Sequence, residues 1–342
     1  MYDCAKDVLG FHDERVTLSQ SDRTAMRDRR NANRERLKNN LKDKGKPLPQ
    51  EFIKQGSYAM LTMVQDPDND YDIDDGVYFT RKSLQGKDGK DMAAKDARQM
   101  VCDALQDDRF NKQPQVRKSC VRIYYEEGYH VDMPIYRITD DSEYELSTGD
   151  SWTISRAADV EDWFNDVNMT KSPDIDNGRQ FRRIVRLLKK FARSRTAWKD
   201  VIATGFTITK LSEECYVANK DREDVALRDT MAAIHRRLLS DLEVNHPVTP
   251  GAKLTSGPDD SSTAFLRDKV AIALDDLKCL DDPACSRKNA LKAWDKVFNT
   301  DFFFSRYQEK SESNGASAVF ANILSSNSNP PAVDKRGGGT FA

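Results

Sequence analysis

Two aspartates separated by a single residue form the segment of this sequence with the clearest chemical potential. Asp72 and Asp74 lie within residues 71–80, whose apolar and aromatic side chains predict a β-strand. Residues two apart share one face of a strand, so both carboxylates project together while Ile73 points into the core. Neighbouring carboxylates repel each other unless a proton or a cation lies between them. Mg²⁺ prefers carboxylate and phosphate oxygens, so the pair suits two Mg²⁺ ions (or Mn²⁺) that carry a nucleoside triphosphate.

A third carboxylate, Asp132, is predicted on a later strand over residues 129–138. The apolar residues of that stretch alternate and leave Asp132 on the opposite face. If the two strands are adjacent in one sheet, Asp132 joins Asp72 and Asp74. Two metal ions about 3.5–4 Å apart would then stabilise the attacking and leaving oxygens of a phosphoryl transfer.

Gly56 and Ser57 lie upstream of the acidic strand and could bind phosphate. Glycine permits a close approach of the backbone, and backbone N–H groups with a serine hydroxyl form an anion-binding nest. A Gly-Ser pair alone carries little information, but its place before an Asp-x-Asp strand narrows the interpretation.

The acidic segment has other possible interpretations besides a metal site on a strand. A solvent-exposed strand face would explain Asp72 and Asp74 alone about as well as a metal site. An EF-hand loop is excluded, because the required Gly and Glu are missing in registers that start at Asp66, Asp68 or Asp70. The sequence also has no GxxxxGK[ST] motif, which excludes a P-loop.

The first half of the chain is predicted to mix helices and strands. Ser21 is the expected N-cap of its first helix, and Gly45 is the expected stop signal. The elements expected here are a helix over 21–44, an apolar segment at 52–64, a strand over 71–80, a helix over 92–105, and strands over 116–125 and 129–138.

The second half is predicted to be helical, which gives an α+β protein with two lobes and a central cleft. We expect a sheet lobe with an N-terminal helix over 1–150, a helical lobe over 151–309 and a flexible tail over 310–342. The periodic segments of the helical lobe are 158–165, 176–195, 207–218, 221–241, 262–280 and 287–306.

Composition excludes several classes of protein. The 54 Lys and Arg balance 56 Asp and Glu, which does not favour a binder of duplex DNA, and no stretch approaches the roughly 20 apolar residues of a spanning helix. The six cysteines form no CxxC pair and no Cys/His cluster exists, which favours reduced thiols over a zinc site. Residues 1–15 lack the apolar core of a signal peptide, so we expect a cytoplasmic protein.

The longer strings around these residues resemble a known family. Gln55–Ser57, the stretch 71–78 and the stretch 130–136 together are similar to the bacterial cGAS-like nucleotidyltransferases (CD-NTases) of CBASS anti-phage systems, and most similar to the cyclic GMP-AMP synthase branch. Residues 160–166 and 181–195 extend the likeness into the second lobe. The resemblance implies a polymerase-β-like nucleotidyltransferase fold.

The resemblance also implies roles for individual residues. Asp72 and Asp74 would bind both metal ions, and Asp132 would hold the catalytic metal and help to deprotonate the attacking ribose hydroxyl. Gly56 and Ser57 would contact the donor triphosphate.

Three further positions follow from the resemblance alone. Lys189 and Thr207 are similar to triphosphate ligands of the family, and Arg122 is similar to an arginine near the acceptor nucleotide. Residues 179–199 contain nine Lys and Arg. Such a run is usually a solvated helix face. The alternative is a basic wall opposite the acidic strand, which would neutralise triphosphate charge.

The resulting expectation is a Mg²⁺-dependent enzyme that joins two NTPs, best assigned as ATP and GTP, into cyclic GMP-AMP with release of pyrophosphate. We expect the enzyme to act in anti-phage defence. It would require neither a membrane nor a stably bound nucleic acid. The alternatives are a transferase that adds nucleotides to RNA and a catalytically inactive nucleotide-binding scaffold. The resemblance further implies that a ubiquitin-transfer-like enzyme of the operon could act on the C-terminus, next to Gly337–Gly339. A merely disordered end is the alternative.

Overall fold

A seven-stranded sheet forms the first lobe of the computed structural model, which describes residues 1–66, 71–126, 128 and 130–308. Its main path runs β1-β2-β5-β4-β3, and β6 and β7 extend it from β5. The strands are β1 (Glu51–Gln55), β2 (Asp72–Thr80), β3 (Gln115–Val116), β4 (Cys120–Tyr124), β5 (His130–Ile138), β6 (Tyr144–Thr148) and β7 (Ser151–Ile154). The mixed α+β fold predicted from the sequence is confirmed.

Strands β2 and β5 are adjacent and parallel in the sheet, as the proposed carboxylate cluster requires. Asp74 is the register partner of Asp132, and Asp72 is the partner of His130. The buried faces of both strands carry the core, with Ile73 and Val131 fully buried. Strands β6 and β7 were missed by the sequence analysis, because their alternation is short and mostly polar.

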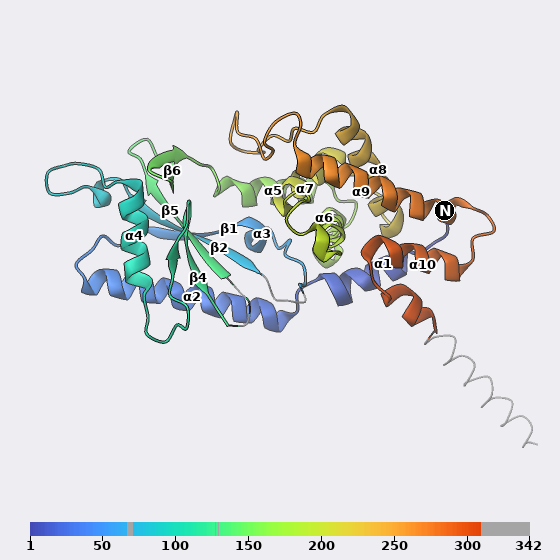
Figure 1. Cartoon of the computed structure of the whole chain (residues 1–342), viewed down its shortest axis with the longest axis horizontal. Helices are drawn as coiled ribbons and strands as arrows, with labels where there is room; N and C mark the ends of the chain where they lie inside the picture. The colour runs from blue at the N-terminus through green and yellow to red at the C-terminus, as the bar shows by residue number, and fades with distance from the viewer. Residues whose placement is uncertain (67–70, 127, 129, 309–342) are drawn as a thin grey trace, which may run out of the picture.

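Helices α2 (Gln20–Asp43) and α4 (Ala94–Leu105) cover the buried face of the sheet, and the four-residue α3 (Gly56–Ala59) follows β1 (Figure 1). The helix expected over 21–44 is present, but its N-cap is Ser19 and not Ser21. The Ser19 hydroxyl accepts the Asp22 N–H at 3.0 Å, because Ser19 has the extended backbone that a cap needs. Gly45 follows the helix with a φ of +58°, as its stop signal requires.

The second lobe is helical, and all six expected segments contain a helix. Its long helices are α5 (Asp159–Lys171), α6 (Gln180–Ala192), α7 (Gly205–Cys215), α8 (Glu223–Ser240), α9 (Ser261–Asp276) and α10 (Arg287–Phe298). Short turns of helix join them at η3 (Asp176–Gly178), η4 (Thr196–Trp198) and η5 (Leu277–Asp281).

The first 16 residues pack with the helical lobe and not with the sheet that follows them in sequence. Val8 and Phe11 of α1 (Ala5–Phe11), Val16 of η1 (His12–Val16) and Cys4, which precedes α1, are buried in the same cluster as residues of α6, α8 and α10. Apolar side chains at helical spacing need an apolar partner, and Phe11 finds it in Phe298 at a ring-centroid distance of 4.6 Å. The chain therefore crosses from the helical lobe to the sheet lobe before α2.

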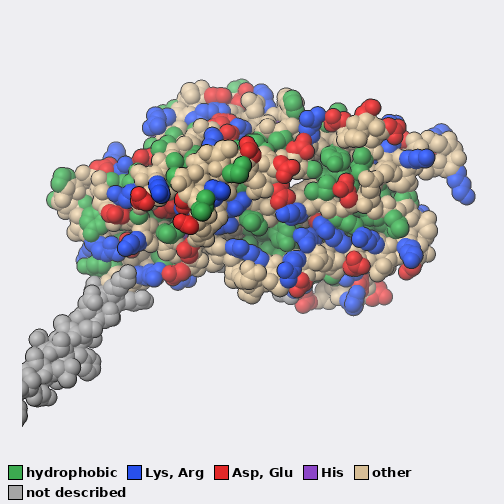
Figure 2. All heavy atoms as spheres, turned by 180° about the vertical axis from the view of Figure 1, so that it is seen from behind, with side chains coloured by type: hydrophobic (Ala, Val, Ile, Leu, Met, Phe, Trp, Pro, Cys, Tyr) green, Lys and Arg blue, Asp and Glu red, His purple; other side chains and the backbone are tan. Residues whose placement is uncertain are grey.

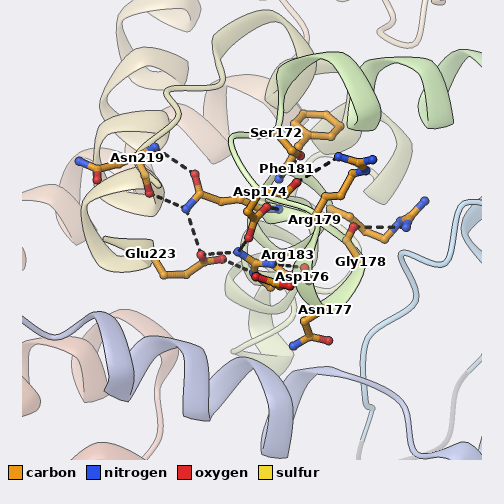
Figure 3. A network of polar contacts seen from close by, with 12 residues as sticks. Ser172, Asp174, Asp176, Asn177, Gly178, Arg179, Phe181, Arg183, Asn219 and Glu223 are labelled. Atoms are coloured by element: carbon orange, nitrogen blue, oxygen red, sulfur yellow. Dashed lines mark hydrogen bonds and ion pairs between the residues drawn. The ribbon is translucent and has the colours of Figure 1, made fainter. Parts of the chain in front are cut away.

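A buried ionic network fixes the start of α6 (Figure 3). Arg183 donates to both carboxylate oxygens of Glu223 at 2.9 and 3.0 Å and to Asp174 at 2.6 Å. Gln180 donates to Glu223 at 3.1 Å and to the Asn219 carbonyl at 2.7 Å. The network joins α6 to α8 and to the α5–α6 loop, so it sets the position of every later residue of α6.

The outer surface carries both signs of charge. Figure 2 shows Lys and Arg side chains interspersed with Asp and Glu over one whole face of the molecule. In the part of the chain that the structure describes, no helix combines the length and the apolar character needed to cross a bilayer.

The Arg183 network gives a stability prediction. Arg183→Ala leaves the buried carboxylates of Glu223 and Asp174 without their cation, so we expect a loss of about 3 kcal/mol in the free energy of unfolding. Urea denaturation measures it. Lys278→Ala, which removes an ion pair between exposed side chains, is the control and should leave the midpoint unchanged. Equal effects of the two variants would contradict the structural role of the network.

Candidate active site

Four neighbouring strands place one polar residue each in a single row across the sheet. Gln55 of β1 is the register partner of Asp74, Asp74 of Asp132, and Asp132 of Arg122 in β4. Arg122 binds Asp132 through two hydrogen bonds, from Nε at 2.8 Å and from Nη2 at 2.7 Å. It also lies 3.2 Å from Asp72. The row therefore brings all three predicted carboxylates together.

The negative charge of this row is only partly compensated. Burial, together with the charges of Asp132 and Asp72, raises the pKa of Asp74 to about 7, against a smaller opposing effect of Arg122. The hydrogen bonds to Asp132 raise the pKa of Arg122, so the guanidinium stays charged. A carboxyl held so close to other carboxylates favours a bound proton or a cation.

Position 56 requires a glycine, because the backbone there lies against the Asp74 carboxylate. Gly56 has a φ of +61°, where side chains are strained, and a Cβ built on it would overlap the Asp74 carboxylate. Gly56 opens α3, so the following residue, Ser57, is held next to the same carboxylate. The predicted proximity of the Gly-Ser pair and the acidic strand is present in the structure.

A cavity of about 480 Å³ lies between the two lobes. On its sheet side it is lined by Ser57, Asp72 and Asp74, and on its helical side by Lys189, Arg193 and residues 204–206. This size is within the range of small-molecule and cofactor sites. The cavity thus has an acidic wall and a basic wall that face each other.

The basic wall comes from α6, but most of its cations are not solvated. Arg183, Arg186 and Lys189 are buried, so the expectation of a solvated helix face is wrong for them. Four cations of α6 donate to the stretch 60–65, which leads from α3 towards β2. The contacts are Arg182 to the Met60 carbonyl at 3.1 Å, Arg186 to the Leu61 carbonyl at 2.8 Å, Lys189 to the Thr62 hydroxyl at 2.8 Å and Lys190 to the Gln65 carbonyl at 2.9 Å.

Lys189 is the cation that lines the cavity from this row. Its side chain is buried, and burial together with the nearby Arg193 and Arg186 lowers its pKa to about 7. A Cβ on Gly205 would lie 3.4 Å from its Cε, so Gly205 lets the lysine approach the N-terminus of α7. An anion near Lys189 would therefore meet an ammonium group and the backbone N–H groups that open a helix.

Thr207 does not line the cavity. It is buried, and its N–H donates to the Thr204 hydroxyl at 3.2 Å. Thr204, which caps α7, lines the cavity in place of Thr207. This helix was expected over 207–218, so its predicted start lies two residues after the observed one. The capping role of Thr204 was missed for that reason. A threonine followed by glycine before an amphipathic run was the signal available.

Arg122 and Asp132 also lie outside the cavity lining, where they bind each other. Within the described residues, no three His, Cys, Asp or Glu side chains converge as a ready metal site. The donor set still fits a hard cation: the oxygens come from carboxylates on rigid strands, and the raised pKa of Asp74 reports unbalanced negative charge. Asp72, Asp74 and Asp132 are the residues that could hold Mg²⁺.

Comparison with a protein-family model identifies the segment that carries this site. Residues 50–136 match the nucleotidyltransferase domain described as cyclic GMP-AMP synthase DncV-like. This stretch contains Gly56, Ser57 and the three aspartates. The predicted resemblance to the bacterial cGAS-like nucleotidyltransferases is confirmed, and residues 50–136 match a nucleotidyltransferase domain, as expected.

Solved structures extend the likeness in fold to most of the chain. Vibrio cholerae DncV cyclic AMP-GMP synthase superposes with a TM-score of 0.69 at 16% identity, covering 89% of this chain and 97% of that one. Its complex with the linear intermediate 5′ pppA(3′,5′)pG gives 0.66 at 18% identity, covering 87% and 96%. CdnC from E. coli MS115-1, in its complex with HORMA-deltaN, gives 0.64 at 19% identity, covering 86% and 96%.

The raised pKa of Asp74 predicts a pH-dependent stability. A carboxyl with a higher pKa in the folded than in the unfolded protein holds its proton more tightly when folded, so stability falls as the pH rises from about 4 to about 7. Without divalent ions, Asp74→Asn should be on the order of 1–2 kcal/mol more stable than wild type at pH 8, with a smaller gain at pH 5.

Urea unfolding in EDTA at the two pH values measures this difference. Asp200→Asn changes an exposed carboxylate of the helical lobe and should give no gain at either pH. An Asp74→Asn protein no more stable than wild type at pH 8 would show that the carboxylates do not repel each other.

Proposed function

We propose that this chain, whose residues 50–136 form a DncV-like nucleotidyltransferase domain, joins two nucleoside triphosphates into a cyclic dinucleotide. The observation that carries the proposal is the cavity, in which Ser57, Asp72 and Asp74 face Lys189 and the N-terminus of α7. The acidic wall suits the reacting phosphate and its bound cations. The basic wall suits the remaining phosphates of the same nucleotide.

The relatives support this choice of reaction. Vibrio cholerae DncV is a cyclic AMP-GMP synthase and has been captured with the linear intermediate 5′ pppA(3′,5′)pG. For the present chain we propose ATP and GTP as substrates, cyclic GMP-AMP as the product, and anti-phage defence in the cytoplasm as the setting.

The proposed reaction begins with attack of a ribose hydroxyl of one nucleotide on the α-phosphorus of the other. The new phosphorus–oxygen bond forms as the bond to the β-phosphate oxygen breaks, and pyrophosphate leaves. Asp132 accepts the hydroxyl proton. A second attack, by the free hydroxyl of the linear intermediate on its own triphosphate, closes the ring with a second pyrophosphate. Bound Mg²⁺ would neutralise the charge that develops on the attacking and leaving oxygens.

Arg122 controls when Asp132 is available. Its two hydrogen bonds occupy one lone pair on each oxygen of Asp132, and an incoming acceptor nucleotide offers phosphate and base oxygens that the guanidinium can bind instead. Arg122 would thus move from Asp132 to the acceptor nucleotide, which agrees with the role that the family resemblance implies.

Lys189 and the start of α7 hold the triphosphate in this proposal. The ammonium group lies beside Gly205, and Thr204 offers a hydroxyl at the same helix end. A triphosphate next to Lys189 raises its lowered pKa again, so binding of the substrate charges the lysine. Lys189 is therefore charged when the substrate is bound. In the free protein its lowered pKa keeps the cost of burying the ammonium group small.

The alternative of a transferase acting on RNA has less support. The cavity has a volume of only about 480 Å³, and the face shown in Figure 2 has mixed charges and no continuous basic surface. A polymer substrate would need a basic track along its backbone.

The central test incubates the purified protein with all four NTPs and Mg²⁺ and identifies the products by mass spectrometry. We expect a cyclic dinucleotide and pyrophosphate. Asp72→Ala and Asp132→Ala should each lower the rate at least about 100-fold, because the negative charges that bind the cations or accept the proton are lost.

Two results would overturn the proposal. Absence of any product, with NTP binding intact, would favour the nucleotide-binding scaffold. Extension of an added RNA in place of cyclisation would favour the RNA-directed transferase. Lys288→Ala, on α10 and far from the cavity lining, serves as the control and should retain wild-type rates.

We also propose that the C-terminus is a conjugation substrate for a ubiquitin-transfer-like enzyme. The residues concerned, Gly337–Gly339 and Ala342, lie outside the described part of the chain. Mass spectrometry of protein from cells that carry the whole operon should find an adduct at Ala342, and an unmodified terminus would contradict the proposal.

A further inference from the structure

A β-hairpin-like loop between α8 and α9 delivers a histidine to the cavity. The loop is closed by backbone hydrogen bonds, from the His246 N–H to the Ala252 carbonyl at 2.9 Å and from the Leu254 N–H to the Val244 carbonyl at 2.8 Å. His246 lines the cavity. No motif in the sequence marks this residue, because the loop meets the site only through the tertiary fold.

The hairpin is held against the helical lobe next to α5 and α7 (Figure 1). Val248 packs against the apolar cluster built around Phe164 and Phe181. The His246 ring meets the Phe206 ring edge to face, at a centroid distance of 5.3 Å and an angle of 80°. The imidazole therefore has a fixed position and orientation at the cavity.

The hydrogen bonds of His246 fix which of its nitrogens carries the proton. Nδ1 accepts the Val248 N–H at 3.3 Å and the Thr249 N–H at 3.0 Å. A nitrogen that accepts two N–H donors cannot itself carry hydrogen, so the neutral ring bears its proton on Nε2. Burial lowers the pKa of His246, which keeps the ring neutral at pH 7. Within the described residues, Nε2–H has no protein acceptor and is not sealed from solvent.

The surroundings of His246 suit a nucleobase better than a phosphate. Phe206 and the apolar side chains of Ala157 and Val160 line the same cavity, whereas the acids and Lys189 form the walls described above. A flat, largely apolar ring with a few polar edge atoms fits between such side chains. A neutral imidazole also attracts phosphate less than the ammonium and helix terminus nearby.

We propose that His246 is a specificity-determining residue that reads the base of the bound nucleotide. Its Nε2–H donates to the edge of a purine, and it favours guanine because N7 and O6 are both acceptors there. Adenine presents N7 beside an N6 amino donor, which would face the Nε2–H donor. The inference rests on the proposed function, since it assigns the base within the same nucleotide site.

The test compares the binding of two purine nucleotides that cannot undergo transfer at the α-phosphate. Titration calorimetry with the α,β-methylene analogues of GTP and ATP, in the presence of Mg²⁺, gives a ratio of dissociation constants. For wild type we expect the GTP analogue to bind about tenfold more tightly, which is the effect of one hydrogen-bond difference. His246→Asn should bring the ratio close to one through weaker binding of the GTP analogue.

The choice of asparagine separates recognition from folding. Its Oδ1 can still accept the Val248 and Thr249 N–H groups, while the donor at Nε2 is removed. A melting temperature close to that of wild type verifies that the hairpin is intact. His246→Gln, whose amide reaches the place of Nε2, should restore part of the preference.

The outcomes separate this inference from the proposed function. An unchanged ratio in His246→Asn, or an equal loss of affinity for both analogues, would overturn the role of His246 even when cyclic dinucleotide is formed. Absence of product in the assay with four NTPs would overturn the proposed reaction, while the ratio of dissociation constants would still test whether His246 distinguishes the bases.

Discussion

The arrangement of the site depends on the hydrogen bonds from the cations of α6 to residues 60–65. These residues follow α3 directly, so they connect the Gly56–Ser57 turn to the helical lobe. Backbone carbonyls that would otherwise need water are satisfied by guanidinium and ammonium groups. The same helix supplies Lys189 to the cavity and is fixed at its start by the Arg183 network. One helix thereby determines both the shape of the cleft and the position of Lys189, the proposed phosphate-binding residue.

A second constraint is the electrostatic cost of the acidic row. Three carboxylates lie close together, and Arg122 compensates them only in part, which leaves Asp74 with a pKa near 7. Strands hold the row because their register leaves its members little freedom to move apart. The site thus stores repulsion that cations and substrate can relieve, a common property of functional sites.

Much of this could be predicted from the sequence, for reasons that are local. Alternation along residues 129–138 was enough to assign Asp132 to the polar face of its strand, since the pleat of a strand fixes the face of each side chain. The adjacency of β2 and β5, which the sequence left as a condition, then brings Asp132 beside Asp74. The N-cap of α2 was misassigned to Ser21, because two serines lie at the start of the helix and only backbone conformation shows that Ser19 is the cap and Ser21 is already helical. Thr204 was missed because the start of α7 was placed two residues late, although the threonine-glycine pair before the helix marks its cap. His246 could not be found from the sequence, because its hairpin reaches the cavity only through the tertiary fold.

The attachment of residues 60–65 to α6 has a mechanical consequence. Four hydrogen bonds join residues 60–65 to α6, so this linker transmits a displacement instead of absorbing it. A movement of α6 therefore also moves Ser57. Relative motion of the acidic and basic walls is therefore restrained, and the width of the cleft is fixed along that side. In the proposed reaction, the linear intermediate would then reorient through the other side of the cavity, which is lined by His246 of the hairpin that backbone hydrogen bonds hold together.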